Sequence, residues 1–403
     1  MPSATYLTLL RMPGAARFFL AAAVGRVGLA MTGLGIVWLV HARTGSYADA
    51  GLVTGCFALA EALGGPQLGR LADRFGQARV LPCAAAVHAG AIGLLFATGP
   101  GTVVGAALAG ASLPQLGACS AARWAALLRG PDGADEAALP RAFTLEALAN
   151  GLSFLAGPAL VSAVGAAGHP RLGVLLAVGL VSGGSLALAV QRSTAPPVAG
   201  RAERRHAGRA LLRPAFARLV ALTLALGVFF GAMQVSVTAY AVGRGTPDLA
   251  PLLYGVSNCT NLVGGWLYGL RRAAAPPARQ LTVAAAFLAL AGLPLLVLDA
   301  PLPVAAALAL TGLAVPVLLV LSSLLTEAAV PGAALTQAFT WLGSASAAGS
   351  AGAAALAGRA VDKAGPHAGF AIGAAAALGM TVLAASPQKP LWKKAQKTEM
   401  RVR

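Results

Sequence analysis

Twelve apolar stretches alternate with short polar gaps along the 403-residue chain. Each stretch has about 20 residues or more, the length that a helix needs to cross the hydrocarbon core of a bilayer. Backbone groups in lipid must be hydrogen-bonded within their own segment, so the pattern predicts an all-α membrane protein with twelve transmembrane helices. The predicted spans are 16–40, 48–68, 80–99, 101–127, 142–167, 171–191, 215–241, 250–270, 280–299, 302–325, 333–357 and 367–386.

The composition supports this interpretation, since 57% of the residues are apolar and only 11% are charged. A soluble domain carries about 25% charged residues, so this chain has too few to cover a water-facing surface. The four cysteines all fall inside apolar stretches, where they behave as small buried side chains. No metal-ligand spacing, nucleotide-binding loop or nucleophile–base constellation is visible. We therefore expect a protein that is not an enzyme and that has no metal site and no cofactor.

Basic residues outnumber acidic residues by 30 to 13, which gives a net charge of +17. With the N-terminus placed inside the cell, 24 basic residues fall on the inner side of the predicted spans and five on the outer side. Positive residues accumulate in the cytoplasmic loops of membrane proteins, so this bias predicts the orientation. We expect a multi-pass protein of the plasma membrane with both termini in the cytoplasm. The charge gives no reason to expect nucleic acid as a partner.

A polar stretch in the middle divides the chain. We predict an N-terminal six-helix half (1–191), a cytoplasmic basic linker (192–213), a C-terminal six-helix half (214–386) and a cytoplasmic Lys-rich tail (387–403). Residues 63–81 match 263–281 at a shift of 200, and residues 139–144 match 335–340 at a shift of 196. Parallel halves related about the membrane normal are an architecture of transporters, with the pathway between them.

The sharpest motif lies between the second and third spans, where residues 69–81 read GRLADRFGQARVL. It resembles the loop signature of the major facilitator superfamily, G-x-L-A-D-R-x-G followed by basic residues, although Gln77 and Ala78 depart from it. The resemblance implies a transporter fold of two pseudo-symmetric halves, similar to the bacterial drug-efflux branch. It also implies a conformational latch made by Gly69, Asp73, Arg74, Gly76 and Arg79.

The chemistry of this motif fits a latch and also a simpler interpretation. Gly69 and Gly76 permit close helix approach and positive φ angles. Asp73 offers a carboxylate to helix N-termini or to arginines at the membrane face. The simpler interpretation is a short re-entry loop that carries ordinary cytoplasmic charge.

The fifth span contains Gly157 and Pro158, which are similar to the antiporter signature of proton-coupled exporters in the same family. The distance from Gly151 is two residues too long, and Val161 and Ser162 replace the closing glycines. The alternative is a helix kink among small packing residues, which is common in membrane helices. The fourth span lacks the family's mid-helix arginine, so proton coupling stays open.

Two ionisable residues fall deep inside predicted spans and are functional candidates for that reason. Arg26 lies about 14 Å into the first span, and Glu61 lies about 12 Å before Gly69 on the neighbouring helix, at 1.5 Å per residue. Since the depths agree, we hypothesise that Arg26 and Glu61 pair in one conformation and that the pair opens toward substrate or protons. The alternative is a permanent structural ion pair.

Other charges cluster near the inner face. Arg123 ends the fourth span, and Arg141 and Glu146 begin the fifth. The family packing would bring Glu146 within reach of the Asp73 loop, so we assign Arg123 and Glu146 to the gate, with substrate contact as the alternative for Glu146. We expect Glu327 to be a solvated loop charge.

Uncharged polar side chains remain as candidates for a substrate cavity. In membrane helices such residues often bond their own backbone or neighbouring helices, which is the simpler interpretation for each. Trp341 is included because its ring can stack on a ligand. The cavity candidates are Asn150, Ser153, Gln234, Asn258, Asn261 and Trp341.

These features together predict a secondary active transporter that works by alternating access. We expect export of a small apolar or amphipathic compound, with protons as the candidate coupling ion. The alternatives are a facilitator or uptake permease for a small metabolite, and a non-transporting receptor or scaffold on the same fold. The expected partners are a small-molecule substrate and the lipid bilayer, and we expect a monomer.

Overall fold

The computed structural model describes residues 6–96, 100–129, 138–246, 248–271 and 275–386. The predicted tail, 387–403, lies outside these residues. Every regular element in the described part is a helix. The elements are α1 (Tyr6–Arg11), α2 (Ala15–Thr44), α3 (Tyr47–Phe75), α4 (Gln77–Leu95), α5 (Pro100–Ala111), α6 (Leu116–Leu128), α7 (Leu139–Ala166), α8 (Pro170–Val190), α9 (Arg201–Ala210), α10 (Pro214–Gly243), α11 (Leu249–Leu270), α12 (Pro277–Gly292), η2 (Leu293–Leu296), α13 (Pro301–Ala329), η3 (Gly332–Ala334), α14 (Leu335–Ala364) and α15 (Pro366–Ala385).

The predicted all-α fold is confirmed, because each of the twelve spans meets its own helical segment. Nine segments among the described residues are long and apolar enough to cross a membrane by these criteria alone. The three that fall short are α3, α11 and α14, and all three lie at contacts between the two groups of helices: α3 packs on α14, and α11 packs on α7. A helix that faces protein over much of its surface needs fewer apolar residues than one that faces lipid.

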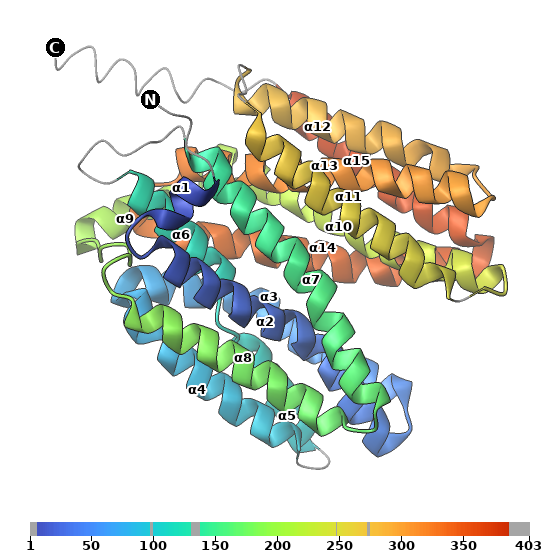
Figure 1. The fold of residues 1–403 in the computed structure, drawn as a ribbon, viewed down its shortest axis with the longest axis horizontal. Helices are drawn as coiled ribbons and strands as arrows, with labels where there is room; N and C mark the ends of the chain where they lie inside the picture. Colours follow the sequence, from blue (N-terminus) through green and yellow to red (C-terminus); the bar gives the residue numbers. More distant parts are fainter. Residues whose placement is uncertain (1–5, 97–99, 130–137, 247, 272–274, 387–403) are drawn as a thin grey trace.

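The two groups of helices are visible in Figure 1. In the first group α2 packs against α8, α7 and α3, and in the second α10 packs against α14 and α15. The connecting helix α9 contacts η3 and lies at the left of Figure 1, near α1. We call this side of the bundle the linker end and the opposite side the far end.

The fourth predicted span is not one helix. α5 ends at Ala111 and α6 begins at Leu116, with residues 112–115 between them. Pro114 lies in this break. Proline has no N–H group and its ring clashes with the preceding turn, so it interrupts a helix that hydrophobicity alone predicts as continuous.

The motif between the second and third spans is also more helical than predicted. α3 continues to Phe75, so Asp73 and Arg74 lie in its last turn, and the expected loop is reduced to Gly76. Gly76 has a φ of 87°, a conformation that glycine adopts without steric cost. The motif is thus a helix end followed by a one-residue turn, which places its charges at fixed positions.

The two groups touch at the linker end and separate toward the far end. A Cβ added at Gly69 would lie 2.5 Å from Thr340 Oγ1, which shows how closely α3 approaches α14 there. Gly51 lies 18 residues earlier and therefore on the same face of α3, yet a Cβ at Gly51 would meet nothing within 4 Å. On α14, Gly358 lies 18 residues after Thr340 and its Cβ direction is equally open. This conformation is closed at the linker end and open at the far end.

Candidate functional site

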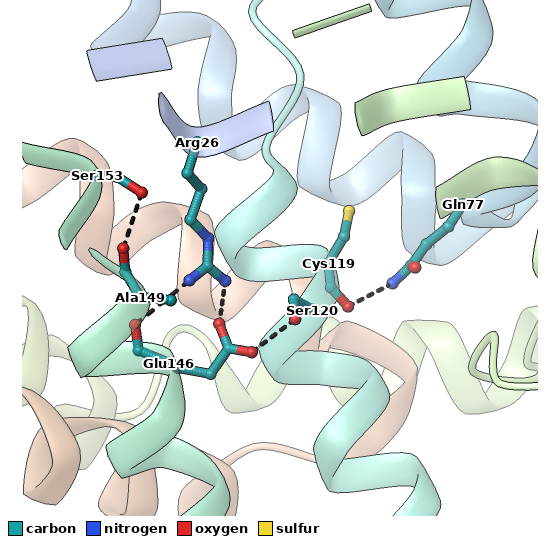
Figure 2. A network of polar contacts seen from close by, with 7 residues as sticks. All are labelled: Arg26, Gln77, Cys119, Ser120, Glu146, Ala149 and Ser153. Carbon is teal, nitrogen blue, oxygen red and sulfur yellow. Dashed lines mark hydrogen bonds and ion pairs between the residues drawn. The ribbon is translucent and has the colours of Figure 1, made fainter. Parts of the chain in front are cut away.

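A polar network joins three helices inside the first group, as Figure 2 shows: Arg26 of α2, Ser120 of α6 and Glu146 of α7. The Arg26 guanidinium forms an ion pair with the Glu146 carboxylate through Nη2 and Oε2. Its Nη1 also donates to the Glu146 carbonyl oxygen at 3.3 Å. Ser120 Oγ donates to the second carboxylate oxygen, Oε1, at 2.6 Å. Glu146 therefore has two partner residues, and Arg26 contacts both the carboxylate and the carbonyl of Glu146.

The network is almost completely shielded, with Arg26 5% exposed and Glu146 11% exposed. Gly117 contributes by its lack of a side chain, since a Cβ there would lie only 3.4 Å from Arg26 Nε. Burying two charges costs several kcal/mol, about as much as a good ion pair returns, and the extra hydrogen bonds are needed to hold it. A network of this kind is a weak source of stability, which makes it a candidate for function.

The hypothesised pair of Arg26 with Glu61 is not formed in this conformation. Arg26 turns toward α7, and Glu61 forms no hydrogen bond or ion pair within the described part of the chain. Depth along the helix suggested the pair, but the contact depends on which face of each helix the residue occupies. Glu61 is half-buried, and a Cβ on Gly110 of α5 would lie 3.0 Å from its backbone nitrogen.

Asp73 links the two groups of helices at the linker end. Its carboxylate accepts hydrogen bonds from the backbone N–H groups of Thr336, at 3.3 Å, and Gln337, at 2.8 Å. These N–H groups belong to the first turn of α14 and have no partner within the helix. The positive end of the helix dipole also favours a carboxylate there. The sequence suggested such a contact, but not which helix would receive it.

The remaining motif residues are two exposed arginines and two glycines. Arg74 is exposed, and its guanidinium lies 4.9 Å from the centre of the Phe75 ring. Arg79 is exposed on α4. Gly69 provides the close approach to α14 and Gly76 the turn, and among the described motif residues Asp73 forms the side-chain hydrogen bonds to the second group.

Of the two residues assigned to the gate, Glu146 pairs with Arg26 and Ser120. The other, Arg123, is fully buried. Its Nε donates to Gln77 Oε1 at 2.7 Å, and its Nη1 to Thr194 Oγ1 at 2.8 Å. Nη1 and Nη2 also donate to the carbonyls of Gln191 and Leu188. Arg123 therefore fastens the start of the linker to α4, α6 and α8.

Gln77 and Thr194 are partners that sequence reasoning missed. Gln77 stands where the family signature has a basic residue, and here it accepts from Arg123 and donates to the Cys119 carbonyl at 3.1 Å. The signal was present in Arg123 itself, because an arginine within an apolar run needs several acceptors.

A second cross-group contact joins Arg129, just after α6, to Glu327 at the end of α13. Arg129 Nη2 donates to Glu327 Oε2 at 2.9 Å, and its Nε lies 2.5 Å from Oε1. Glu327 is 4% exposed, so its prediction as a solvated loop charge is wrong.

The cavity candidates divide into three kinds. Ser153 is buried and donates to the Ala149 carbonyl at 2.8 Å (Figure 2), so its hydroxyl is already used inside α7. Asn258 and Asn261 are half-buried on α11. The exposed candidates are Asn150, Gln234 and Trp341.

Gly157 and Pro158 lie within α7, which stays helical through both residues. A Cβ on Gly157 would lie 2.7 Å from Ala30 Cβ and 3.0 Å from the Val27 carbonyl oxygen. The glycine therefore allows α7 to pack closely on α2 at Val27 and Ala30, about three turns along α7 from Glu146. This geometry agrees with the packing role that was the alternative to the antiporter signature.

Several solved structures share this fold. The human organic anion transporter MFSD10 (TETRAN) has a TM-score of 0.70 and 15% identity, over 92% of this chain and 98% of its own. A bacterial homologue of the iron transporter ferroportin in an outward-facing state has a TM-score of 0.71 and 14% identity, over 92% and 98%. The E. coli fucose:proton symporter FucP has a TM-score of 0.73 and 12% identity, over 94% and 99%. These identities establish the fold alone.

A search of curated proteins finds no match to this sequence. The sequence profile described as Major Facilitator Superfamily matches residues 18–305. That match covers more than half of the chain, extends through the motif, the polar network and the connecting helix α9, and agrees with the fold of the solved structures. The chain therefore belongs to the major facilitator superfamily of secondary transporters, which carry small molecules across membranes.

Proposed function

We propose that this transporter exports a small amphipathic compound in exchange for protons, and that Arg26 and Glu146 carry the coupling. The observation behind the proposal is their ion pair, which is buried between three spanning helices. A scaffold has no need of such a pair, because its desolvation cost brings little net stability. An ion pair that one proton can break is what a proton-coupled transporter requires.

The orientation rests on the positive-inside rule. The predicted spans place 24 of the 30 basic residues on the inner side of the sequence map, and the described inner-side helix ends lie at the linker end. We therefore assign the linker end to the cytoplasm and the protein to the plasma membrane, with both termini inside. The conformation described above is then outward-open. In this assignment Asp73 on α14 and Arg129 with Glu327 hold the cytoplasmic side closed.

Transport follows when the two halves, 1–191 and 214–386, rock about the site between them. Opening the linker end requires Asp73 to leave the N-terminus of α14 and Arg129 to leave Glu327. These two contacts consist of a few hydrogen bonds and one ion pair. We expect new contacts between the halves at the far end to offset their loss. Such rocking of one half against the other is how alternating access operates in transporters built from repeats.

The coupling step is a change of partner. A proton that enters from the far end is accepted by the Glu146 carboxylate, which loses its charge and its hold on Arg26. The guanidinium keeps its charge and turns to Glu61, the unpaired carboxylate on the neighbouring helix α3. Release of the proton from Glu146 to the cytoplasm restores the pair seen here. The predicted Arg26–Glu61 pair thus belongs to the protonated state.

The test is flux in liposomes that contain the purified protein, with an imposed pH gradient and a panel of cationic, neutral and anionic amphipathic compounds. We expect compound and protons to move in opposite directions, and we expect Glu146→Gln to abolish the response to the gradient. Glu203→Gln is the matched control, since Glu203 is an exposed carboxylate on α9. Movement in the same direction indicates a symporter, flux indifferent to pH a facilitator, and binding without flux a receptor. Each of these results contradicts the proposal.

A further inference from the structure

Three polar groups lie around one stretch of α3, between the closed linker end and the open far end: Glu61 of α3, Gln115 at the α5–α6 break and Ser344 of α14. A Cβ on Gly65 would lie 3.0 Å from Ser344 Oγ and 3.5 Å from Gln115 Cδ, so these two side chains flank α3 at that level. Glu61 is four residues earlier and faces the same direction, one turn closer to the far end. The three groups come from three separate segments, one of them in the second group of helices.

Each of the three presents an acceptor that the protein leaves unused. Glu61 has no hydrogen bond or ion pair within the part of the chain that the structure describes. Gln115 Nε2 donates to the Leu113 carbonyl at 3.0 Å, which leaves Oε1 as an acceptor. Ser344 Oγ forms no hydrogen bond to any described residue. Other serines in these helices, such as Ser153 and Ser236, bond the carbonyl one turn earlier.

The charges favour a cation at this place. Arg26 and Glu146 neutralise each other, so of these three charged residues Glu61 keeps a negative charge without a counter-charge. A carboxylate in a low-dielectric surrounding attracts a positive group far more strongly than it does in water. The position is partly accessible, because Glu61 is half-buried. The Cβ direction of Gly51, about 15 Å nearer to the far end of α3, is also open.

We infer that Glu61, Gln115 and Ser344 form a binding site for the ammonium group of a protonated primary amine, the polar end of the transported compound. An ammonium has three N–H donors and no acceptor, which matches one carboxylate, one amide oxygen and one hydroxyl oxygen. A carboxylate or phosphate on the ligand would be repelled by Glu61. This inference rests on the proposed transport function and specifies its substrate class.

The site also fits the exchange of partners proposed above. While Arg26 is held by Glu146, Glu61 is free to bind the amine. When a proton displaces Arg26, its guanidinium competes for Glu61 and expels the amine. One proton taken up is then exchanged for one cation released. The covalent bond that changes is the O–H bond of Glu146, which forms on protonation and breaks when the proton is released.

The test is binding to the full-length protein in lipid nanodiscs, measured by calorimetry with phenethylammonium, its N,N,N-trimethyl analogue, 2-phenylethanol and 3-phenylpropionate. We expect phenethylammonium to bind tightest and the trimethyl analogue to bind more weakly, because it has charge but no donor. Glu61→Gln should weaken phenethylammonium binding by about tenfold or more, and Ser344→Ala by a few-fold, as expected for a charge-assisted and a neutral hydrogen bond. The control, Glu203→Gln, should leave binding unchanged.

The inference is overturned if 2-phenylethanol or 3-phenylpropionate binds as well as the amine, if phenethylammonium does not bind the wild type, or if Glu61→Gln and Glu203→Gln behave alike. Melting of the ligand-free variants shows that a loss of binding is not a loss of folding. The flux experiment separates this inference from the proposed function. Amine binding that depends on Glu61 without proton exchange retains the site and rejects antiport. Proton exchange driven only by neutral or anionic compounds retains antiport and rejects the site.

Discussion

The two halves of this transporter share one fold but hold their corresponding helices together by different means. In the first half, α2 meets α7 by close packing at Gly157 and, in addition, through the Arg26–Glu146 ion pair. In the second half, α10 meets α14 through backbone, because Cβ atoms on Gly227 and Gly231 would lie 2.0 Å from the carbonyl oxygens of Ser346 and Ser350. At the shift of 196 residues that relates α7 to α14, Leu342 stands in the place of Glu146, and it is buried.

The difference indicates that the buried charges of the first half are not required to hold its helices together. Glycine and serine surfaces let membrane helices approach closely without any charge, and the second half demonstrates that this solution works in the same architecture. The first half instead retains two charges whose burial costs about as much as their attraction gives. This contrast supports the proposal that the two charges serve the movement of protons and substrate, and the predictions below test it.

The largest expected effect comes from breaking the ion pair on one side. Glu146→Leu leaves the Arg26 guanidinium buried without its counter-charge, which should cost about 3–5 kcal/mol of stability. The double variant Arg26→Leu/Glu146→Leu installs apolar residues of the kind used in the second half, and it should recover most of that loss. Thermal unfolding in detergent measures both. A double variant as unstable as Glu146→Leu would mean that the first half depends on the charges for its folding.

The second effect concerns packing in the other half. Gly231→Ala pushes a methyl group into the Ser350 carbonyl, and overpacking of this kind costs about 1–3 kcal/mol. Gly343→Ala on α14 is the matched control, since its Cβ would meet nothing within 4 Å. Unfolding temperatures of the two variants should therefore differ clearly. Equal temperatures would show that α10 and α14 do not pack as closely as described.

A smaller effect is expected at the latch. Asp73→Asn keeps the shape of the side chain but removes its charge from the N-terminus of α14, which weakens the contact by about 0.3–2 kcal/mol. The linker end should then open more often, and cysteine labelling at that end reports it. Arg70→Gln, an exposed position on the same helix, serves as the control. Labelling that is the same in Asp73→Asn and Arg70→Gln would contradict a latch role.

The smallest effect is expected for Arg129→Gln. The Arg129 side chain is 43% exposed, so solvent and salt screen its attraction to Glu327. We expect a shift of about 1 kcal/mol or less toward an open linker end, and a smaller shift at high salt. The same labelling experiment at two salt concentrations measures it. A shift larger than that of Asp73→Asn would mean that the Arg129–Glu327 contact, and not the Asp73 contact, contributes most to closing the linker end.

Much of the fold was predictable because lipid imposes a length and an apolar composition on every span. The break at residues 112–115 was missed, since the run 101–127 is apolar throughout and Pro114 is the main sign of an interruption. The extension of α3 through Asp73 was missed for a related reason. The end of an apolar run predicts where a helix leaves the lipid. The helix itself can continue beyond that point, because its backbone hydrogen bonds do not depend on apolar side chains.

The site was predicted less well than the fold. Asp73 was identified by its motif, and its helix N-terminal contact follows from the chemistry of a carboxylate. The partner that Arg26 has in this conformation, Glu146, was not predicted, because depth along a span does not say which face of its helix a residue occupies. In segments rich in alanine and glycine, the sequence carries little information about which face is turned inward.

The most direct test of the central claim is compound flux driven by a pH gradient in liposomes with the Arg26→Leu/Glu146→Leu variant. The account predicts a folded protein whose flux no longer responds to the gradient, while the Glu203→Gln control responds as the wild type does. A double variant that still couples flux to the pH gradient would contradict the claim that this ion pair carries the coupling.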